Sequence, residues 1–360
     1  MIFDPWPKET KEDLFDFDEE VNTIIKALRD PSVRLIIIKG LRRTGKSSIL
    51  RVALNLAKYN YILLDMREFA EIDRETFTRA FSKALLDMLR EKSKRRKIME
   101  HIRAVTFMGM RIDLSEVKDE IDYRILLREI NSWAKKKNTF FVLAIDEAQE
   151  VAKINFDKYL AFVYDNLTRI KIILAGSQVG VISKILEDPR KPLFGRARVE
   201  INTRRLTREQ AIGFLTQGFE EAGIRIDQNI LSRIVNKLDG VIGWLTLFGW
   251  YVVQGKDPDE ALNLVLSNGI KLVKNELDLF LETRGTGKRR YILVLKILAE
   301  GPRRWKEVKE IMEIKLRRRI ANNQITRYLT ELVKYGFIEK RENLYYIPDP
   351  LLRETIMKEY

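Results

Sequence analysis

The chain has 360 residues, no cysteine and one histidine. The lack of cysteine excludes disulfides and thiolate metal sites, and the single His101 argues against a histidine metal site or a Ser-His-Asp triad, so we expect the chemistry to use carboxylates, lysine, arginine and hydroxyls. Its length and 45% hydrophobic content predict two or three domains, and the lack of an apolar run of about 18 residues or of a basic-then-apolar leader predicts a cytoplasmic protein without a membrane anchor. The net charge is +14, and 18 basic against 10 acidic residues in the range 286–360 indicate a polyanionic partner for the C-terminal part, or a solvated charged surface.

The first informative segment is a glycine-framed loop between an apolar run and a helical pattern. "RLIIIK" predicts a buried parallel strand, and "SSILRVALNLAKY" has helical spacing. The intervening "GLRRTGKS" fits the pattern G-x-x-x-x-G-K-[ST]. A loop of this kind cradles phosphates with its backbone N–H groups, while its lysine reaches the β- and γ-phosphates and its hydroxyl ligates Mg²⁺. The predicted nucleotide-binding residues are Gly40, Leu41, Arg42, Arg43, Thr44, Gly45, Lys46, Ser47 and Ser48; the alternative is a purely structural glycine turn.

The next segments carry weaker signals. "YILLD" predicts a strand that ends in Asp65, which we interpret as structural. The insert "AVTFMGMRIDL" predicts a small hairpin around Gly109. The basic run "KSKRRK" before it is a candidate contact patch or, more simply, a solvated helix, and His101 is interpreted as a surface residue.

Two further apolar strands end in polar residues. "FFVLAIDEAQ" ends in a pair of acids, and ligands of parallel sheets bind beyond the carboxyl ends of the strands. We expect Asp146 to hold the Mg²⁺ ion and Glu147 to polarise the attacking water. "KIILAGSQ" ends in Ser177 and Gln178, which are candidates to contact the γ-phosphate or orient the water; a simple strand-end turn explains them nearly as well.

Arginines follow in "DPRKPLFGRARVEI". Arg196 lies on a predicted loop and Arg198 at the start of the next strand. A loop arginine at this point could stabilise transition-state charge on its own nucleotide or on that of a neighbouring subunit. An ordinary surface arginine fits the sequence equally well.

After residue 201 the strand pattern gives way to helical periodicity. "TREQAIGFLTQGFEEAG" opens with a capping box from Thr207 to Gln210, and a helical lid is predicted to end near "RGTGKRR". The predicted domains are therefore an ATPase core at 1–201, a lid at 202–285 and a third domain at 286–360.

The third domain has three predicted helices followed by two short strands, the order of a winged helix. Helical spacing predicts a buried face on the third helix, formed by Ile325, Leu329, Leu332 and Val333. The residues expected to face outward to nucleic acid are Asn323, Gln324, Arg327 and Tyr328 in this helix, Lys340 and Arg341 in the wing, and the basic run 317–319. The alternative is a winged helix that docks a protein or inhibits its own chain.

The order of these motifs, with "LDGVIGWLTLFG", "KRRYILVLKILAEGPRRWKEV" and "LYYIPDPLLR", resembles the archaeal ATPases in the AAA+/STAND region of the P-loop NTPases over nearly the whole chain. The resemblance implies an α/β fold with an ASCE-type parallel sheet, followed by a lid and a winged helix. In such a sheet an additional strand separates the Walker A strand, which here leads into the Gly40–Ser47 loop, from the Walker B strand, which here ends in Asp146 and Glu147. It also implies ATP or ADP and Mg²⁺ as ligands, Ser177 as the sensor, Arg196 as the family's "GR" arginine and "GVIGWL" as a lid segment that contacts nucleotide. The chain departs from the family pattern at Ile242 or Gly243, where a proline is usual, and after the first phenylalanine of "FDFDEE", where an arginine is common.

The sequence therefore predicts a Mg²⁺-dependent ATPase whose nucleotide state moves the lid and the winged helix, with duplex DNA or another macromolecule as the target. Lys46, Mg²⁺ and Arg196 would neutralise the charge that develops as water attacks the γ-phosphate. Two alternatives are a slow nucleotide-gated signalling scaffold with a protein partner, and an origin-recognition-like DNA-binding initiator. Adenine is favoured by the resemblance and by the absence of an N-K-x-D signature.

Overall fold

The computed structural model describes residues 1–69, 73–90, 104–107, 110–113 and 122–360. His101 and the "KSKRRK" run lie outside these ranges. Within them, no helix combines the length and the apolar character needed to cross a lipid bilayer.

The N-terminal part is a five-stranded parallel sheet with the strand order β2-β5-β6-β1-β7. The strands are β1 (Leu35–Lys39), β2 (Asn60–Asp65), β5 (Phe141–Asp146), β6 (Ile170–Gly176) and β7 (Val199–Asn202). Because β6 lies between β1, which leads into the glycine loop, and β5, which ends in the acid pair, the predicted ASCE-type order is confirmed.

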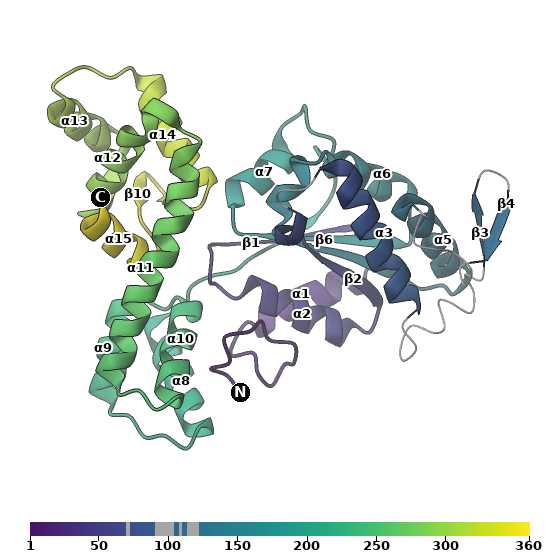
Figure 1. The fold of residues 1–360 in the computed structure, drawn as a ribbon, viewed down its shortest axis with the longest axis horizontal. Coiled ribbons are helices and arrows are strands. Elements are labelled where there is room, and N and C mark those ends of the chain that lie inside the picture. The colour runs from purple at the N-terminus through teal and green to yellow at the C-terminus, as the bar shows by residue number, and fades with distance from the viewer. Residues whose placement is uncertain (70–72, 91–103, 108–109, 114–121) are drawn as a thin grey trace.

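Helices cover both faces of this sheet (Figure 1). On one face lie α1 (Asp18–Arg29) and α2 (Lys46–Ala57), and on the other α3 (Arg74–Arg90), α5 (Tyr123–Lys136), α6 (Phe156–Asn166) and α7 (Val179–Glu187). Ile36 and Ile38 of β1 are buried towards the first face, Leu35 and Ile37 towards the second. Strands buried on both faces read as continuous apolar runs, as seen in the sequence. The predicted hairpin is present as β3 (Ala104–Phe107) and β4 (Met110–Asp113), and short 3-10 helices follow β2 (η1, Met66–Phe69) and β5 (η2, Ala148–Ala152).

The lid consists of α8 (Arg208–Glu221), α9 (Gln228–Leu238) and α10 (Ile242–Val253), and α8 has the predicted capping box between Thr207 and Gln210. The long helix α11 (Pro258–Glu282) then runs from the lid to the C-terminal domain (Figure 1). At 25 residues it is about 37 Å long, so it links the two parts rigidly.

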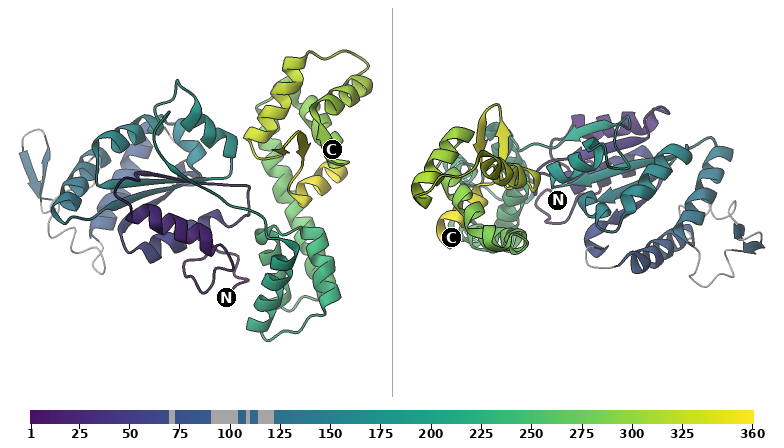
Figure 2. Two further views of the ribbon diagram at one scale, coloured as in Figure 1. Left: turned by 180° about the vertical axis from the view of Figure 1, so that it is seen from behind. Right: turned by 90° about the horizontal axis from the view of Figure 1, so that it is seen from above.

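The C-terminal domain is a winged helix that begins after η3 (Gly285–Gly287). It contains α12 (Lys288–Ala299), β8 (Arg303–Arg304), α13 (Trp305–Leu316), α14 (Asn322–Lys334), β9 (Glu339–Arg341) and β10 (Leu344–Tyr346). A last helix, α15 (Pro350–Glu359), which the sequence analysis did not predict, packs against α11 and α12. Lid and winged helix therefore share one hydrophobic core, and they lie beside the sheet domain with the N-terminal segment between the two parts (Figure 2).

Candidate nucleotide-binding site

The loop between β1 and α2 has a backbone that only particular residues allow. Gly45 has a φ of 87° and Arg43 a φ of 62°, both in the left-handed region. A Cβ on Gly40 would lie 2.1 Å from Thr203 Oγ1, so glycine is required there. Thr44 Oγ1 lies 2.6 Å from the same Thr203 oxygen, which fixes the loop to the segment that follows β7.

Lys46 is the first residue of α2, and only 6% of its surface is exposed. Its ammonium group donates a hydrogen bond to the carbonyl oxygen of Leu41. Burial lowers the pKa of Lys46 to about 8, although the nearby Glu147 and Asp146 carboxylates act in the opposite direction. The cation thus lies inside the loop that is predicted to hold phosphates.

The structure brings Ser47 and Asp146 together from α2 and β5. Ser47 Oγ donates a hydrogen bond of 2.6 Å to Asp146 Oδ2, and burial raises the pKa of the Asp146 carboxyl. A hydroxyl and a carboxylate oxygen are ligands that suit Mg²⁺, which usually takes one or two protein oxygens and completes its shell with phosphate and water. The described residues contain no cluster of three or more histidine, cysteine or acidic side chains that would hold a metal ion by themselves.

Glu147, the proposed base, and Ser177, the proposed sensor, meet at the carboxyl ends of β5 and β6. Ser177 Oγ donates a hydrogen bond of 3.2 Å to Glu147 Oε2, and Glu147 has a φ of 50°. Both residues, with Gln178, line a cavity of about 650 Å³ that also contains Lys46 and Ser47. Of the predicted residues, Lys46, Ser47, Glu147, Ser177 and Gln178 therefore surround one space that is large enough for a nucleotide.

Other walls of this cavity come from the N-terminal segment, which was not predicted, and from the lid segment "GVIGWL", which the family resemblance predicts to contact nucleotide. The N-terminal segment contributes Trp6, which is 77% exposed, and Phe17, while the lid contributes Ile242. Phe17 and Ile242 both lie within 4 Å of the Cβ position at Gly45. These apolar residues enclose the cavity from segments far apart in the sequence, and the spacing of Trp6 and Phe17 offered no signal of this role. Arg67, which follows β2, also lines the cavity.

The two candidate arginines lie elsewhere. Arg196 binds Asp165 through Nε at 3.2 Å and through its terminal nitrogen at 2.5 Å, and it does not line the cavity. Arg198 pairs with Glu200. In this arrangement neither arginine contacts the phosphate side of its own site.

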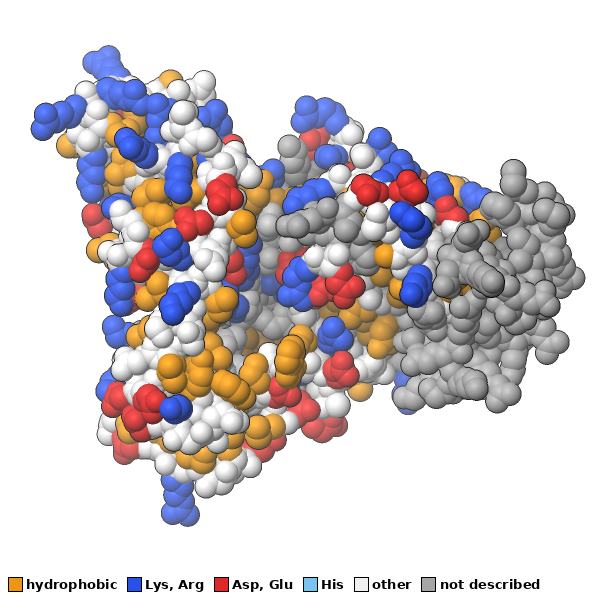
Figure 3. Space-filling model, in the orientation of Figure 1, with side chains coloured by type: hydrophobic (Ala, Val, Ile, Leu, Met, Phe, Trp, Pro, Cys, Tyr) orange, Lys and Arg blue, Asp and Glu red, His pale blue; other side chains and the backbone are white. Residues whose placement is uncertain are grey.

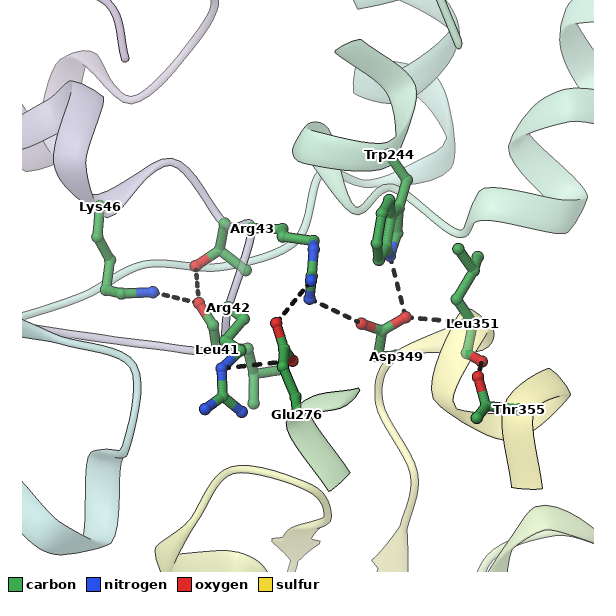
Figure 4. A network of polar contacts seen from close by, with 10 residues as sticks. Leu41, Arg42, Arg43, Lys46, Trp244, Glu276, Asp349, Leu351 and Thr355 are labelled. Carbon is green, nitrogen blue, oxygen red and sulfur yellow. Dashed lines mark hydrogen bonds and ion pairs between the residues drawn. The ribbon is translucent and has the colours of Figure 1, made fainter. Parts of the chain in front are cut away.

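The side chains at the centre of the loop face the lid and the winged helix (Figure 4). Arg43 lies 2.7 Å from Glu276 of α11 and 4.0 Å from Asp349, which precedes α15. Its guanidinium group also lies 4.2 Å from the ring centroid of Trp244 in α10, and Trp244 Nε1 donates a hydrogen bond of 3.0 Å to Asp349 Oδ1. One loop residue therefore contacts three elements outside the sheet domain.

The lid also approaches the loop through its backbone. The N–H of Gly243 donates a hydrogen bond of 3.0 Å to the carbonyl oxygen of Arg43. A Cβ on Gly243 would lie 2.7 Å from the Arg43 Cβ, so the glycine allows the first turn of α10 to sit directly on the loop.

The winged helix places most of its predicted contact residues at the surface, with one correction. Asn323, Arg327, Lys340 and Arg341 are exposed and Gln324 is half-buried. Tyr328 was predicted to face outward, but it is fully buried and its hydroxyl accepts a hydrogen bond of 2.8 Å from Arg290. The prediction was wrong because Tyr328 lies one turn from Ile325 on the same apolar face, and Arg290 satisfies its hydroxyl. Val333 is only partly buried.

Fold and site together define the class of protein: a P-loop ATPase with an ASCE-type sheet, a helical lid and a C-terminal winged helix. The chain belongs to the family described as the ATPase domain predominantly from Archaea, whose model matches residues 14–246. Residues 286–348 match the model of the MCM protein C-terminal winged helix-turn-helix domain.

Solved structures agree with this assignment. The Walker-type ATPase PABY2304 of Pyrococcus abyssi is 29% identical over 99% of this chain and 100% of its own, with a TM-score of 0.82. The ORC2 protein of Aeropyrum pernix, in its ADPNP-ADP complexes, is 12% identical over 99% of this chain and 96% of its own, with a TM-score of 0.56, and shows the shared fold alone. A search of curated proteins finds no match.

The lowered pKa of Lys46 predicts a pH-dependent nucleotide affinity. In the free protein Lys46 loses its proton as the pH rises through about 8, whereas bound phosphates favour the protonated form, so binding must take up a proton above that pH. We expect the ATP affinity to fall by up to about tenfold per pH unit above pH 8, as measured by calorimetry in buffers of different ionisation enthalpy. Lys46→Arg stays charged and should remove this slope; an unchanged wild-type affinity between pH 7 and about 9.5 would contradict the assignment.

Proposed function

We propose that this protein is a Mg²⁺-dependent ATPase whose nucleotide state controls the position of its winged helix and the access of duplex DNA to that domain. The observation that carries the ATPase assignment is that Lys46, Ser47 and Glu147 line one cavity at the carboxyl edge of the sheet, with Asp146 hydrogen-bonded to Ser47 beside it. This set provides a phosphate-binding cation, oxygen ligands for the metal and a carboxylate base.

In the proposed reaction the chain's own groups have separate tasks. The loop N–H groups and Lys46 bind the β- and γ-phosphates, and Ser47 and Asp146 hold Mg²⁺, which neutralises phosphate charge. Glu147 orients a water and accepts its proton as the water attacks the γ-phosphate. Phe17 and Ile242 line the cavity and exclude bulk water from one side of it. Since Arg196 is paired with Asp165, a role for it in charge stabilisation is proposed only towards the nucleotide of a neighbouring subunit.

Control of the winged helix is supported by the contacts of the loop arginines. Glu276 of α11 binds Arg43 at 2.7 Å and lies 3.5 Å from Arg42, whose guanidinium is 5.8 Å from the ring centroid of Phe337. The loop that holds phosphate thus also holds the domain that follows α11. A ligand that moves the loop must change these contacts, which is the physical requirement for coupling between two sites.

The contact between the sheet domain and the winged helix also covers part of α14, the helix that is proposed to enter DNA. A Cβ on Gly180 of α7 would lie 2.5 Å from Lys334 Cα, and a Cβ on Gly336 would lie 3.1 Å from the carbonyl oxygen of Ser177. The C-terminal end of α14 therefore rests on the sheet domain, while basic side chains gather on the outer end of the winged helix (Figure 3). We propose that a duplex engages this domain fully only after the docking contacts are released.

Glu276→Gln tests whether the contact between α11 and the loop arginines limits duplex binding and makes it depend on the bound nucleotide. Loss of the charge weakens the hold of α11 on the loop arginines, so we expect duplex affinity to rise by about fivefold or more and to become insensitive to the exchange of ADP for a non-hydrolysable ATP analogue. The measurement is fluorescence anisotropy of a labelled duplex at several salt concentrations, since phosphate contacts give a salt-dependent affinity.

Glu282→Gln is the matched control, because Glu282 is exposed at the end of the same helix. An unchanged affinity in Glu276→Gln would remove the proposed coupling. If the wild type itself shows no salt-dependent duplex binding in any nucleotide state, duplex DNA is not the target of the winged helix, and a protein partner takes its place.

A further inference from the structure

Gln149 is a buried glutamine beside the acid pair that neither the phosphate loop nor the metal ligands account for. It lies in η2, two residues after Glu147, and only 6% of its surface is exposed. Its side-chain amide Nε2 donates a hydrogen bond of 2.5 Å to Glu147 Oε2. The residue thus contacts the carboxylate that is proposed to activate water.

Two donors meet on this one carboxylate oxygen. Besides Gln149, Ser177 donates to Glu147 Oε2 from the end of β6. Within the described part of the chain, the second oxygen, Oε1, makes no hydrogen bond, and Glu147 lines the nucleotide cavity. The carboxylate is therefore fixed through Oε2, and Oε1 remains available to accept a proton from water.

The amide oxygen of Gln149 lies in an energetically unfavourable position. Its Oε1 is buried and has no hydrogen-bond partner among the described residues. Exchanging the amide oxygen and nitrogen would turn the oxygen towards the Glu147 carboxylate, so the hydrogen bond fixes the orientation. A buried acceptor without a partner destabilises the folded chain. Stability alone does not explain a glutamine here, whereas a task performed by its Nε2 does.

The surrounding residues keep the side chain in this place. A Cβ on Gly176, the last residue of β6, would lie 2.5 Å from Gln149 Oε1 and 2.6 Å from Ile182 Cδ1. Glycine at this position provides the space that the amide occupies. The contact between η2 and the end of β6 is therefore built around Gln149.

We infer that Gln149 is a positioning residue of the ATPase site: with the Ser177 hydroxyl, its amide holds Glu147 so that the free carboxylate oxygen faces the attacking water. The inference rests on the proposed ATPase function. It concerns the geometry of the base and not the binding of nucleotide, because the hydrogen bond of the Gln149 side chain goes to Glu147 and, within the described residues, not to the loop that is proposed to bind phosphate. A base displaced by about 1 Å can lose about 100-fold in rate.

The test is Gln149→Met in the full chain, which keeps the length of the side chain and removes the donor. We expect kcat for ATP to fall by about 10- to 100-fold while KM and the affinity for a fluorescent ATP analogue change by less than about twofold. In the Glu147→Gln background the same substitution should cause no further loss, because the group that it positions is already gone. Gln217→Met, at an exposed position of α8, is the matched control.

Three outcomes would overturn the inference: a kcat equal to that of the wild type, a loss that appears mainly in KM, or an equal loss in both backgrounds, which would indicate a merely structural role. Gln149→Ala, which is smaller, provides a second variant if Gln149→Met melts at a markedly lower temperature. Failure of the proposed function is distinguishable, since in that case the wild type itself releases no phosphate.

Discussion

Lys46→Ala is expected to lower the affinity for ATP by about 100-fold, which corresponds to about 2.7 kcal/mol. Two effects add. The substitution removes the cation that is proposed to bind the β- and γ-phosphates, and it leaves the Asp146 and Glu147 carboxylates without the buried positive charge beside them. Both effects oppose the approach of a triphosphate. Calorimetric titration with a non-hydrolysable ATP analogue and Mg²⁺ measures the change directly.

Lys26→Ala is the control for this experiment, since Lys26 is exposed on α1. It removes one positive charge without touching the loop, so its affinity should stay within about twofold of the wild type. If Lys46→Ala bound nucleotide as tightly as the wild type, the loop would not be the phosphate site, and the ATPase proposal would be wrong.

Glu147→Gln is expected to reduce ATP turnover by about 100- to 1,000-fold while nucleotide affinity stays within about threefold. Glutamine preserves the shape of the side chain but cannot accept the proton of the attacking water. Binding should persist because phosphate contacts are assigned to Lys46 and the loop. Steady-state phosphate release and titration with the fluorescent analogue separate the two quantities.

The result also separates the proposed ATPase from a slow nucleotide-gated switch. An ATPase gives linear phosphate release over many turnovers in the wild type and almost none in Glu147→Gln, which then accumulates bound ATP. Wild-type turnover that was already negligible, with nucleotide tightly retained, would favour the switch. Turnover in Glu147→Gln within about fivefold of the wild type would show that another group activates the water.

Local sequence patterns predicted those parts of the site that belong to one continuous segment. The loop from Gly40 to Ser47 needs glycines for backbone conformation and close approach, and a lysine and a hydroxyl for phosphate and metal, so its spacing is visible in one chain. The acids after β5 and Ser177 after β6 were predicted because parallel strands present their carboxyl ends at one edge of the sheet. Hydrogen bonds that join Ser47 to Asp146 and Ser177 to Glu147 agree with that expectation.

The same patterns could not predict contacts between segments far apart in the chain. Glu276 and Asp349 meet Arg43 only because α11 and the start of α15 are brought to the loop by packing of the lid and the winged helix. Tyr328 shows the related limit within one helix. The helical spacing of the apolar residues left it on the outward face, and the partner that allows its burial, Arg290, lies on α12.

By itself the sequence determined the phosphate loop, the acid pair and the winged helix, because each depends on periodicity, spacing or residue type within a short segment. The class of fold and the ASCE-type strand order were implied by the family resemblance. Only the tertiary structure decided that Gln149 holds Glu147, that the N-terminal segment encloses one side of the cavity, and that the loop arginines contact the winged-helix unit. These contacts depend on side-chain packing between distant elements, and many sequences with the same local periodicity would pack those elements differently.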